Sequence, residues 1–513
     1  MERIGHWING QHQQGASGLR APVWNPTTGE VQAEVDLASV AEVDAAVAAA
    51  AAAFPAWAAK SLAARTNIMF RFRELLDGNR KALGALISRE HGKTAADADG
   101  EIARGLDNVD FACGLSQLLK GSYSAGVSGG IDVHSLRQPL GVVAGITPFN
   151  FPAMVPLWML PTAIACGNTF ILKPSERDPS ASLFLADLLR QAGVPAGVVS
   201  VVQGDRTAVE RLLEHPGIQA VSFVGSTEIA RHIYSTATSH GKRVQALGGA
   251  KNHMVVLPDA DLESAADAAV SAGYGSAGER CMAVAVVVAV GEIADPLVAA
   301  IAARLPNIQV GTGTGGASEM GPLITREHRD RVAGYLADAP AEGAELRVDG
   351  RENPASDRPG FFLGASLLDR VQPGSHAHVE EIFGPILSVV RVDTYEQAME
   401  VVGSTQYGNG ASIFTRDGGV ARRFSEEVQA GMIGINVPVP VPVAQYSFGG
   451  WKGSLFGDLH MYGPEGMQFY TRGKVVTSRW PDASTSGVDL GFPTSDGPQS
   501  HQPTSDGPQG DGA

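Results

Sequence analysis

The stretch LGVVAGITPFN, residues 140–150, is a β-branched run that ends in turn residues. The same pattern returns three times: NTFILKPSE (168–176), GVVSVVQG (197–204) and IQAVSFVGS (218–226). Helical stretches separate these runs, and strands that alternate with helices predict a parallel sheet covered by helices. Ligands bind such sheets at the carboxyl ends of the strands. Asn150, Lys173 and Ser226 fall at those ends, so we expect them to lie in a binding site.

A second α/β region is predicted from about residue 250 to 445. Near the N-terminus, Ser39 with Glu42 three residues later forms a capping box ahead of an Ala-rich helix. At the other end, residues 481–513 repeat PTSDGPQ and are rich in Pro, Gly, Ser and Asp. A segment of that composition cannot bury a core, so we expect a disordered tail.

The composition is that of a globular protein, with 44% apolar and 18% charged residues. The net charge of −15 argues against a nucleic-acid partner. No apolar run approaches the roughly 20 residues of a membrane span, and the N-terminus lacks the apolar core of a signal peptide. The three cysteines form no disulfide framework, and no Cys/His spacing suggests zinc or another metal. A cytoplasmic protein that acts away from membranes is expected.

Cys281 differs from Cys113 and Cys166 in its surroundings. It stands in GSAGERCMAV (275–284). Small residues there allow close backbone approach, and Arg280 would favour the thiolate. Context alone leaves two readings of Arg280 open, an aid to a nucleophile or a surface salt bridge.

Six motifs in this order resemble the aldehyde dehydrogenase superfamily, and the resemblance extends from NPTTGEV (25–31) to about residue 475. The motifs are TPFNFP (147–152), LKPSE (172–176), FVGS (223–226), GGAKN (248–252), GERC (278–281) and EEIFGP (380–385). Within the superfamily the chain looks most like the CoA-acylating methylmalonate-semialdehyde (malonate-semialdehyde) dehydrogenases, because of RVQALGGAKNH and of the Arg directly before the cysteine.

The resemblance implies an α/β fold of the aldehyde dehydrogenase type in three units. Residues 1–120 and 140–248 would form a Rossmann-type NAD-binding domain, and residues 249–446 an α/β catalytic domain. Residues 121–139 and 447–480 would form a small oligomerisation arm. Such arms pair across subunits in the family, so a homodimer or homotetramer is expected.

In this resemblance Cys281 is the nucleophile that adds to an aldehyde. Asn150, with the Cys281 backbone N–H, would hold the resulting oxyanion. Taken by itself, Asn150 is equally a turn residue between two phenylalanines.

The hydride acceptor implied is NAD. The residues implied to bind it are Thr147, Phe149, Lys173, Glu176, Arg177, Ser226, Gly248, Glu381 and Phe383. Glu176 can accept ribose hydroxyls and would repel a 2′-phosphate, which favours NAD over NADP, although the neighbouring Arg177 would soften that repulsion. The family spacing after FVGS ends in a glycine, and here Ala230 replaces it.

One absence sets the chain apart from the hydrolytic members of the superfamily. Those members carry a glutamate four residues before the lysine of E-L-G-G-K, and it activates the deacylating water. Counting back from Lys251 gives Leu247, and the interval from Leu247 to Cys281 matches the family's register. Without that base, coenzyme A is the expected acyl acceptor.

Arg104 and Arg280 are expected to bind a substrate carboxylate. The predicted reaction is therefore the oxidative decarboxylation of malonate or methylmalonate semialdehyde to acetyl-CoA or propanoyl-CoA, CO₂ and NADH. Two alternatives stay open: a hydrolytic semialdehyde dehydrogenase that makes the free acid, and a non-catalytic NAD-binding homologue. The sequence decides neither the preferred semialdehyde nor the CoA-binding residues.

Overall fold

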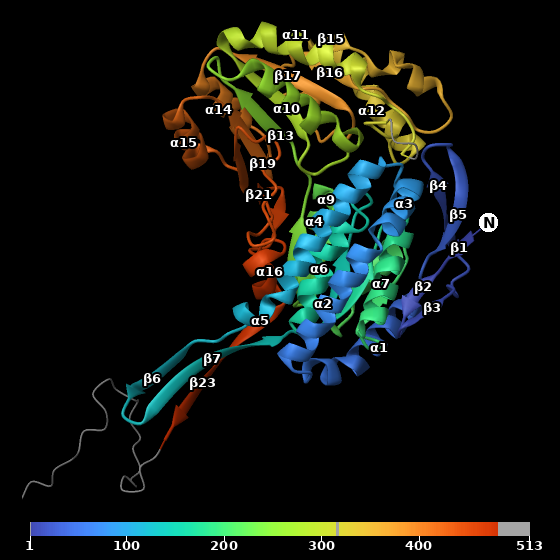
Figure 1. Ribbon diagram of the computed structural model, residues 1–513, viewed down its shortest axis with the longest axis vertical. Coiled ribbons are helices and arrows are strands. Elements are labelled where there is room, and N and C mark those ends of the chain that lie inside the picture. The colour runs from blue at the N-terminus through green and yellow to red at the C-terminus, as the bar shows by residue number, and fades with distance from the viewer. Residues whose placement is uncertain (1, 314–317, 481–513) are drawn as a thin grey trace, which may run out of the picture.

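The computed structural model describes residues 2–313 and 318–480, so the predicted tail lies outside the described residues. Two large sheets with their helices form two lobes, and a long three-stranded ribbon projects from the first lobe (Figure 1). This arrangement confirms the predicted α/β class.

The first large sheet has eight strands in the order β22-β12-β11-β8-β9-β10-β2-β3. The five strands from β12 to β10 are parallel and include the four runs predicted from the sequence. They are β8 (Val142–Ile146), β9 (Thr169–Lys173), β10 (Val199–Val201), β11 (Ile218–Val224) and β12 (Arg243–Leu247). The antiparallel edge strands are β2 (His6–Ile8), β3 (Gln11–Gln13) and β22 (Leu455–Phe456).

Helices connect the parallel strands, as a parallel sheet requires. The connecting helices are α6 (Met154–Ala165), α7 (Ser180–Ala192), α8 (Arg206–Glu214) and α9 (Thr227–Ser239). Alternate strand residues enter different cores: Phe170 and Leu172 pack with α6 and α7, whereas Ile171 packs on the opposite face. This two-sided burial explains why the strands are apolar throughout.

The N-terminal helices are α1 (Val40–Ala58), α2 (Leu62–Gly78), α3 (Arg80–His91), α4 (Ala95–Cys113) and α5 (Leu115–Leu118). Helix α1 packs on the same sheet, whereas α2, α3 and α4 pack on α6 and α7. The predicted capping box of Ser39 and Glu42 starts α1. Within the described residues, α1 alone is long and apolar enough to cross a membrane by length and composition. It buries Val43, Ala46 and Val47 in the core under this sheet, which is the packing of a core helix in a globular domain.

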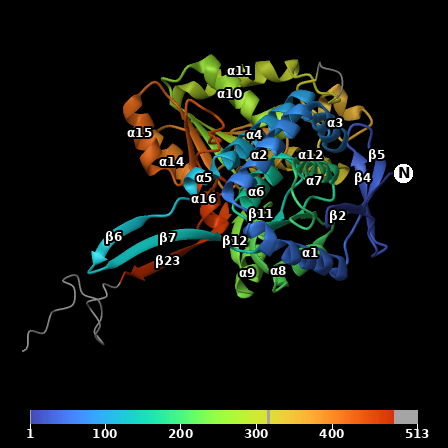
Figure 2. The ribbon, with the colours of Figure 1, turned by 60° about the horizontal axis from the view of Figure 1, so that its bottom comes forward.

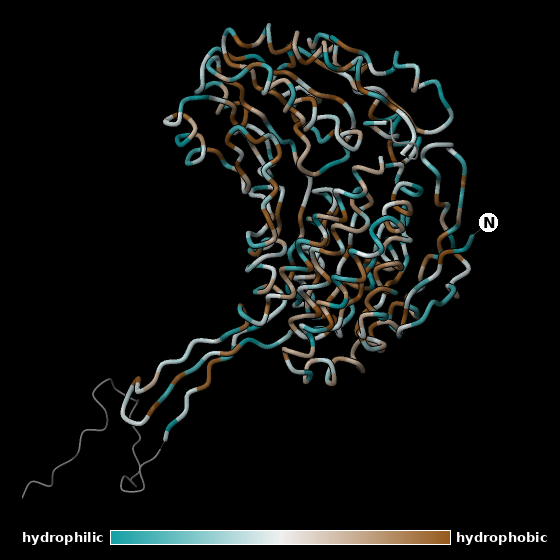
Figure 3. Tube along the Cα trace, viewed as in Figure 1, coloured by the Kyte–Doolittle hydropathy of each residue, from teal (hydrophilic) through white to brown (hydrophobic). Residues whose placement is uncertain are grey.

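The second large sheet has seven strands in the order β15-β16-β17-β14-β13-β19-β20, parallel except for β15. Its strands are β13 (Asn252–Val256), β14 (Val284–Val290), β15 (Glu345–Val348), β16 (Ser366–Asp369), β17 (Ile386–Val392), β19 (Gly410–Phe414) and β20 (Met432–Ile435). Its helices are α10 (Leu262–Tyr274), α11 (Ala294–Arg304), α12 (Arg326–Asp338), α13 (His376–Val379), α14 (Tyr395–Gly403) and α15 (Gly418–Glu427). A separate apolar cluster fills this lobe, and Figure 3 shows hydrophobic segments inside both lobes.

The projecting ribbon consists of β6 (Tyr123–Ser128), β7 (Ile131–Pro139) and β23 (Thr471–Arg479). Figure 2 shows it extending away from both lobes. The sequence prediction assigned all of 447–480 to this arm, whereas only its last part joins the ribbon. Strand β22 instead pairs with β12, and α16 (Gly463–Phe469) packs on α6. Because β22 and α16 are short, the sequence contains no periodic pattern that would predict where they pack.

Three further strands, β1 (Glu2–Ile4), β4 (Arg20–Asn25) and β5 (Glu30–Asp36), form a small N-terminal sheet. A two-stranded sheet joins β18 (Tyr407–Gly408) to β21 (Trp451–Lys452).

Candidate active site

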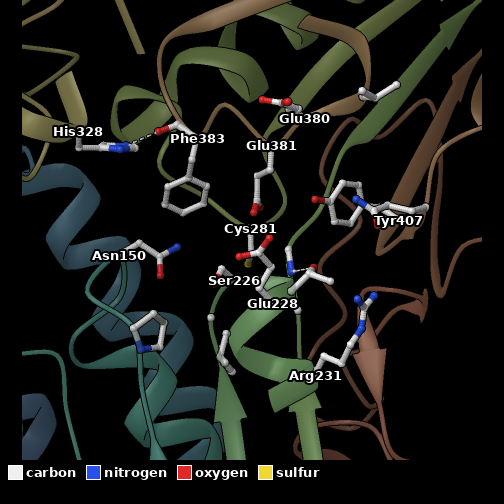
Figure 4. Close-up of a pocket in the computed structure, with 18 of the residues that line it drawn as sticks. Asn150, Ser226, Glu228, Arg231, Cys281, His328, Glu380, Glu381, Phe383 and Tyr407 are labelled. Atoms are coloured by element: carbon white, nitrogen blue, oxygen red, sulfur yellow. Dashed lines mark hydrogen bonds between the residues drawn. The ribbon is translucent and has the colours of Figure 1, made fainter. Parts of the chain in front are cut away.

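A cleft of about 1030 Å³ lies between the strand ends of the first lobe and the loops of the second. Phe149, Asn150, Ser226 and Gly248 line it from the first lobe. The predicted residues Cys281, Glu381 and Phe383 line it from the second, and Figure 4 shows the labelled side chains pointing into it. The fold therefore brings together segments that are far apart in the sequence.

Cys281 sits in a strained turn between α10 and β14. Ser276 has φ of 54° and Ala277 has φ of 53°. These angles lie in the left-handed region, which costs non-glycine residues on the order of 1–3 kcal/mol each. Gly278 follows at φ 74°, where a Cβ would lie 2.3 Å from the carbonyl oxygen of Gly384. The glycine of GERC is thus required by close approach of two backbones.

Two amide side chains hold the backbone of the nucleophile. The carbonyl oxygen of Cys281 accepts hydrogen bonds from Asn252 Nδ2 at 2.9 Å and from Asn409 Nδ2 at 3.1 Å. Both asparagines are buried, so these bonds are protected from competing water. The position of the sulfur is therefore set by groups of the second lobe.

The thiol of Cys281 is not activated in this state. Burial, together with the charge of Glu381, raises its pKa to about 12, and the charge of Lys93 acts in the opposite direction. Arg280 donates to Asp97 Oδ1 at 2.5 Å, so its charge is already neutralised by an ion pair. The expectation that Arg280 promotes the thiolate finds no support in this geometry.

Asn150 links the two lobes at the inner end of the cleft. Its Nδ2 donates to the carbonyl oxygen of Glu279 at 3.0 Å, two residues before the nucleophile. That bond uses one of the two N–H groups, and the other is available for an oxyanion. The side chain is buried, and Figure 4 shows it on the same cleft as Cys281.

The residues predicted to bind the cofactor fall into two sets. Phe149, Arg177, Ser226, Gly248, Glu381 and Phe383 line the cleft. Thr147, Lys173 and Glu176 are not among the residues that line the cleft. Lys173 Nζ donates to Glu176 at 3.1 Å and, against the effect of burial, helps to hold the pKa of that carboxyl below its usual value. Arg177 lies over the ring of Phe149, 5.1 Å from its centroid, and its charge also helps to lower the pKa of Glu176.

The cleft suits a dinucleotide in several respects. Ser226 is the residue before α9, so the N-terminus of that helix faces the cleft. A helix N-terminus favours phosphate. Arg231 and Arg331 add positive charge to the lining. A Cβ on Gly249 would lie 2.3 Å from Glu381 Oε2, so only glycine there lets this carboxyl approach. Glu381 accepts from the backbone N–H of Ala250 at 2.9 Å.

Leu247 ends β12 and is buried, so the position of the missing glutamate holds an apolar side chain. Two other carboxyl groups lie near the nucleophile. Burial raises the pKa of Glu279 to about 8 and that of Glu381 to about 7. At neutral pH Glu279 is therefore mostly protonated and Glu381 partly so. A general base works best with a pKa near the operating pH, so by pKa both Glu279 and Glu381 qualify as candidate bases.

A second cavity, of about 580 Å³, meets the cleft at Cys281. Arg104 and Arg280 both line it, together with apolar residues such as Trp158 and Phe448. Arg104 donates to the carbonyl oxygen of Pro442 at 2.9 Å and to Asp107 at 3.2 Å. The two guanidinium groups are therefore brought to one cavity, and each is already held by protein partners.

Sequence reasoning missed three charged residues beneath the site: Lys93, Glu101 and Glu279. Glu101 lies between Asp97 and Arg104 on α4, at spacings of four and three residues. Residues at those spacings share one face of a helix. Because Asp97 and Arg104 both contact other parts of the site, this spacing could have indicated that Glu101 faces the site as well.

The Aldehyde dehydrogenase family profile matches residues 12–476, and the chain belongs to that family. The malonate-semialdehyde dehydrogenase of Pseudomonas aeruginosa is 54% identical to this chain, over 96% of the chain and 100% of that protein. Malonate-semialdehyde dehydrogenase 2 of Geobacillus kaustophilus is 47% identical, over 94% and 99%.

The fold is also similar to that of solved structures. The crystal structure of methylmalonate-semialdehyde dehydrogenase from Oceanimonas doudoroffii has a TM-score of 0.93 and 53% identity, over 94% of this chain and 99% of that one. A protein of Sinorhizobium meliloti 1021, described as a methylmalonate-semialdehyde dehydrogenase complexed with NAD, has the same TM-score at 50% identity and the same coverage. The resemblance stated from the sequence motifs is confirmed.

Proposed function

We propose that this protein oxidises malonate semialdehyde or methylmalonate semialdehyde with NAD⁺ and transfers the acyl group to coenzyme A. The products are acetyl-CoA or propanoyl-CoA, CO₂ and NADH. The relatives named above support the substrate class, and the cleft beside Cys281 supports a dinucleotide. The observation that carries the acylating form of the reaction is the buried Leu247 at the position of the hydrolytic base.

The reaction begins when the Cys281 sulfur adds to the aldehyde carbon. The carbonyl oxygen becomes negative, and the free N–H of Asn150 Nδ2 with the Cys281 backbone N–H stabilises that charge. NAD⁺, when bound, supplies the acceptor for the hydride that leaves the substrate carbon. The product on the protein is a thioester at Cys281.

Arg104 and Arg280 orient the substrate carboxylate in the second cavity. After oxidation this carboxylate lies β to the thioester carbonyl, so its C–C bond can break and release CO₂. The electron pair passes to the carbonyl oxygen as an enolate, which the Asn150 oxyanion site stabilises before a proton is added at carbon. The thiolate of coenzyme A then attacks the thioester and frees Cys281.

Glu381 and Phe383 are proposed to hold the nicotinamide riboside, and Ser226 at the start of α9 the pyrophosphate. Thr147, Phe149 and Gly248 are proposed to complete this part of the cofactor site. Glu176, with Lys173, is proposed to bind the adenosine ribose. A carboxylate there disfavours a 2′-phosphate, which supports NAD over NADP.

We further propose a cytoplasmic homodimer or homotetramer in which the ribbon of β6, β7 and β23 pairs across subunits. Exposed apolar side chains on this ribbon include Tyr123, Val127 and Val475. Strands β6 and β23 are the two edges of the ribbon, and an unpaired strand edge can pair with another chain.

The proposal is tested by incubating the protein with malonate semialdehyde and NAD⁺, with and without CoA, and identifying the products. We expect acetyl-CoA and CO₂ in step with NADH. Free acid formed at the same rate without CoA would support the hydrolytic alternative. Undiminished NADH formation by Cys281→Ser would show that this cysteine is not the nucleophile.

A further inference from the structure

A buried ion pair lies directly beneath the oxyanion residue. Lys93 Nζ donates to Glu101 Oε2 at 2.7 Å, and the side chains of the two residues are 1% and 0% exposed. Removing two charges from water is costly, and a buried pair often adds no stability over apolar side chains of similar volume. Stability alone therefore does not explain why charged residues occupy this place.

Both members of the pair hold the turn that carries Asn150. Lys93 Nζ donates to the carbonyl oxygen of Asn150 at 2.5 Å and lies 3.9 Å from the ring centroid of Phe151. Glu101 Oε1 accepts from the backbone N–H groups of Ala153 at 2.8 Å and Met154 at 3.0 Å. The pair thus binds residues 150–154 at both ends of the turn.

The contacts continue from this turn to the nucleophile. Asn150 Nδ2 donates to the carbonyl oxygen of Glu279, which precedes Arg280 and Cys281. On α4, one turn before Glu101, Asp97 pairs with Arg280. Helix α4 therefore contacts the turn that carries Asn150 through Glu101 and the residue before Cys281 through Asp97.

We propose that Lys93 and Glu101 are positioning residues that hold the Asn150 amide in register with Cys281. The inference rests on the proposed addition of Cys281 to an aldehyde.

The test compares Lys93→Met, Glu101→Gln and Lys93→Arg with the wild type. Asp99→Asn serves as the matched control, because Asp99 lies on the same helix in an exposed pair with Arg80. The first readout is NADH formation from malonate semialdehyde. A misplacement of about 1 Å in catalytic geometry can cost about 10²-fold in rate. We expect kcat to fall about 10- to 100-fold in Lys93→Met and Glu101→Gln, with KM for NAD⁺ within about twofold of wild type.

The second readout is hydrogen–deuterium exchange of residues 150–154, which needs neither aldehyde nor CoA. Lys93 and Glu101 bind the backbone of this turn, so Lys93→Met and Glu101→Gln should exchange faster there than Asp99→Asn. Lys93→Arg keeps the cation and should exchange more slowly than Lys93→Met.

Two results would overturn the inference. One is kcat in Lys93→Met and Glu101→Gln within about twofold of Asp99→Asn. The other is a loss of kcat that follows the loss of folded protein, measured by circular dichroism, with exchange of residues 150–154 no faster than in Asp99→Asn. If the wild type itself makes no NADH from the semialdehyde, the proposed function fails, and the exchange of residues 150–154 still decides whether the pair holds this turn.

Discussion

Arg280 Nη2 lies 2.5 Å from Asp97 Oδ1, so the residue beside the nucleophile is oriented by the first turn of α4. The guanidinium keeps further N–H groups for a substrate carboxylate. In Arg280→Met we expect kcat/KM for malonate semialdehyde to fall about 10- to 100-fold, since a hydrogen bond to a charged group is worth about 1.5–3 kcal/mol.

Propanal provides the control for that measurement, because it lacks a carboxylate. Its kcat/KM should change by less than about threefold in Arg280→Met. An equal loss for both aldehydes would show that Arg280 supports the nucleophile loop and does not select the substrate.

Asn150→Ala should remove the side-chain donor to the oxyanion. Loss of one such donor typically costs on the order of 10²–10³ in kcat. We expect that loss in steady-state NADH formation, while alkylation of Cys281 continues at a rate within a few-fold of wild type. Wild-type kcat in this variant would contradict the proposed role.

Leu247→Glu restores a carboxyl group at the position where hydrolytic members carry one. We expect NADH formation without CoA to increase, because the new carboxylate can deprotonate a water near the thioester. Leu247→Gln is the matched control, since it has similar volume and polarity and no base. Equal CoA-independent rates in the two variants would show that position 247 does not face the thioester.

Glu279 provides a test by pH. Burial raises its pKa from 4.5 to about 8, so the folded protein holds a proton there that the unfolded chain releases. Stability therefore falls as the pH rises through that interval, by at most about 1.4 kcal/mol per pH unit from this group. Glu279→Gln should remove that component, so the variant's Tm should drop less than the wild-type Tm between about pH 5.5 and pH 8. Parallel Tm profiles would contradict the assignment.

Sequence reasoning reached the class of fold because the strands of the first sheet are apolar on both faces and end in turn residues. The runs that end at Asn150 and Ser226 show this most clearly. The family resemblance assigned residues 447–480 to the arm, and of these only β23 joins the ribbon. The pairing of β22 with β12 joins segments far apart in the sequence through very short strands, which carry no periodic pattern that could reveal their partner.

The candidate site was predictable where a motif carried it, as for Cys281 and Asn150. The partners of those residues were not predictable, because ion pairs depend on distances that spacing does not give. Arg280 was expected to activate Cys281, whereas in the structure it pairs with Asp97. Lys93 itself follows α3 in a short turn, and its contact with Asn150 spans 57 residues of sequence.

The measurement that tests the central claim most directly is a single-turnover experiment. The protein is mixed with malonate semialdehyde and NAD⁺ in the absence of CoA, and NADH and the intact mass of the protein are followed. We predict one NADH per active site, then a stall with an acyl group retained on Cys281, and release of that group as acetyl-CoA when CoA is added. Continued NADH formation without CoA, with no acyl group on Cys281, would contradict the account.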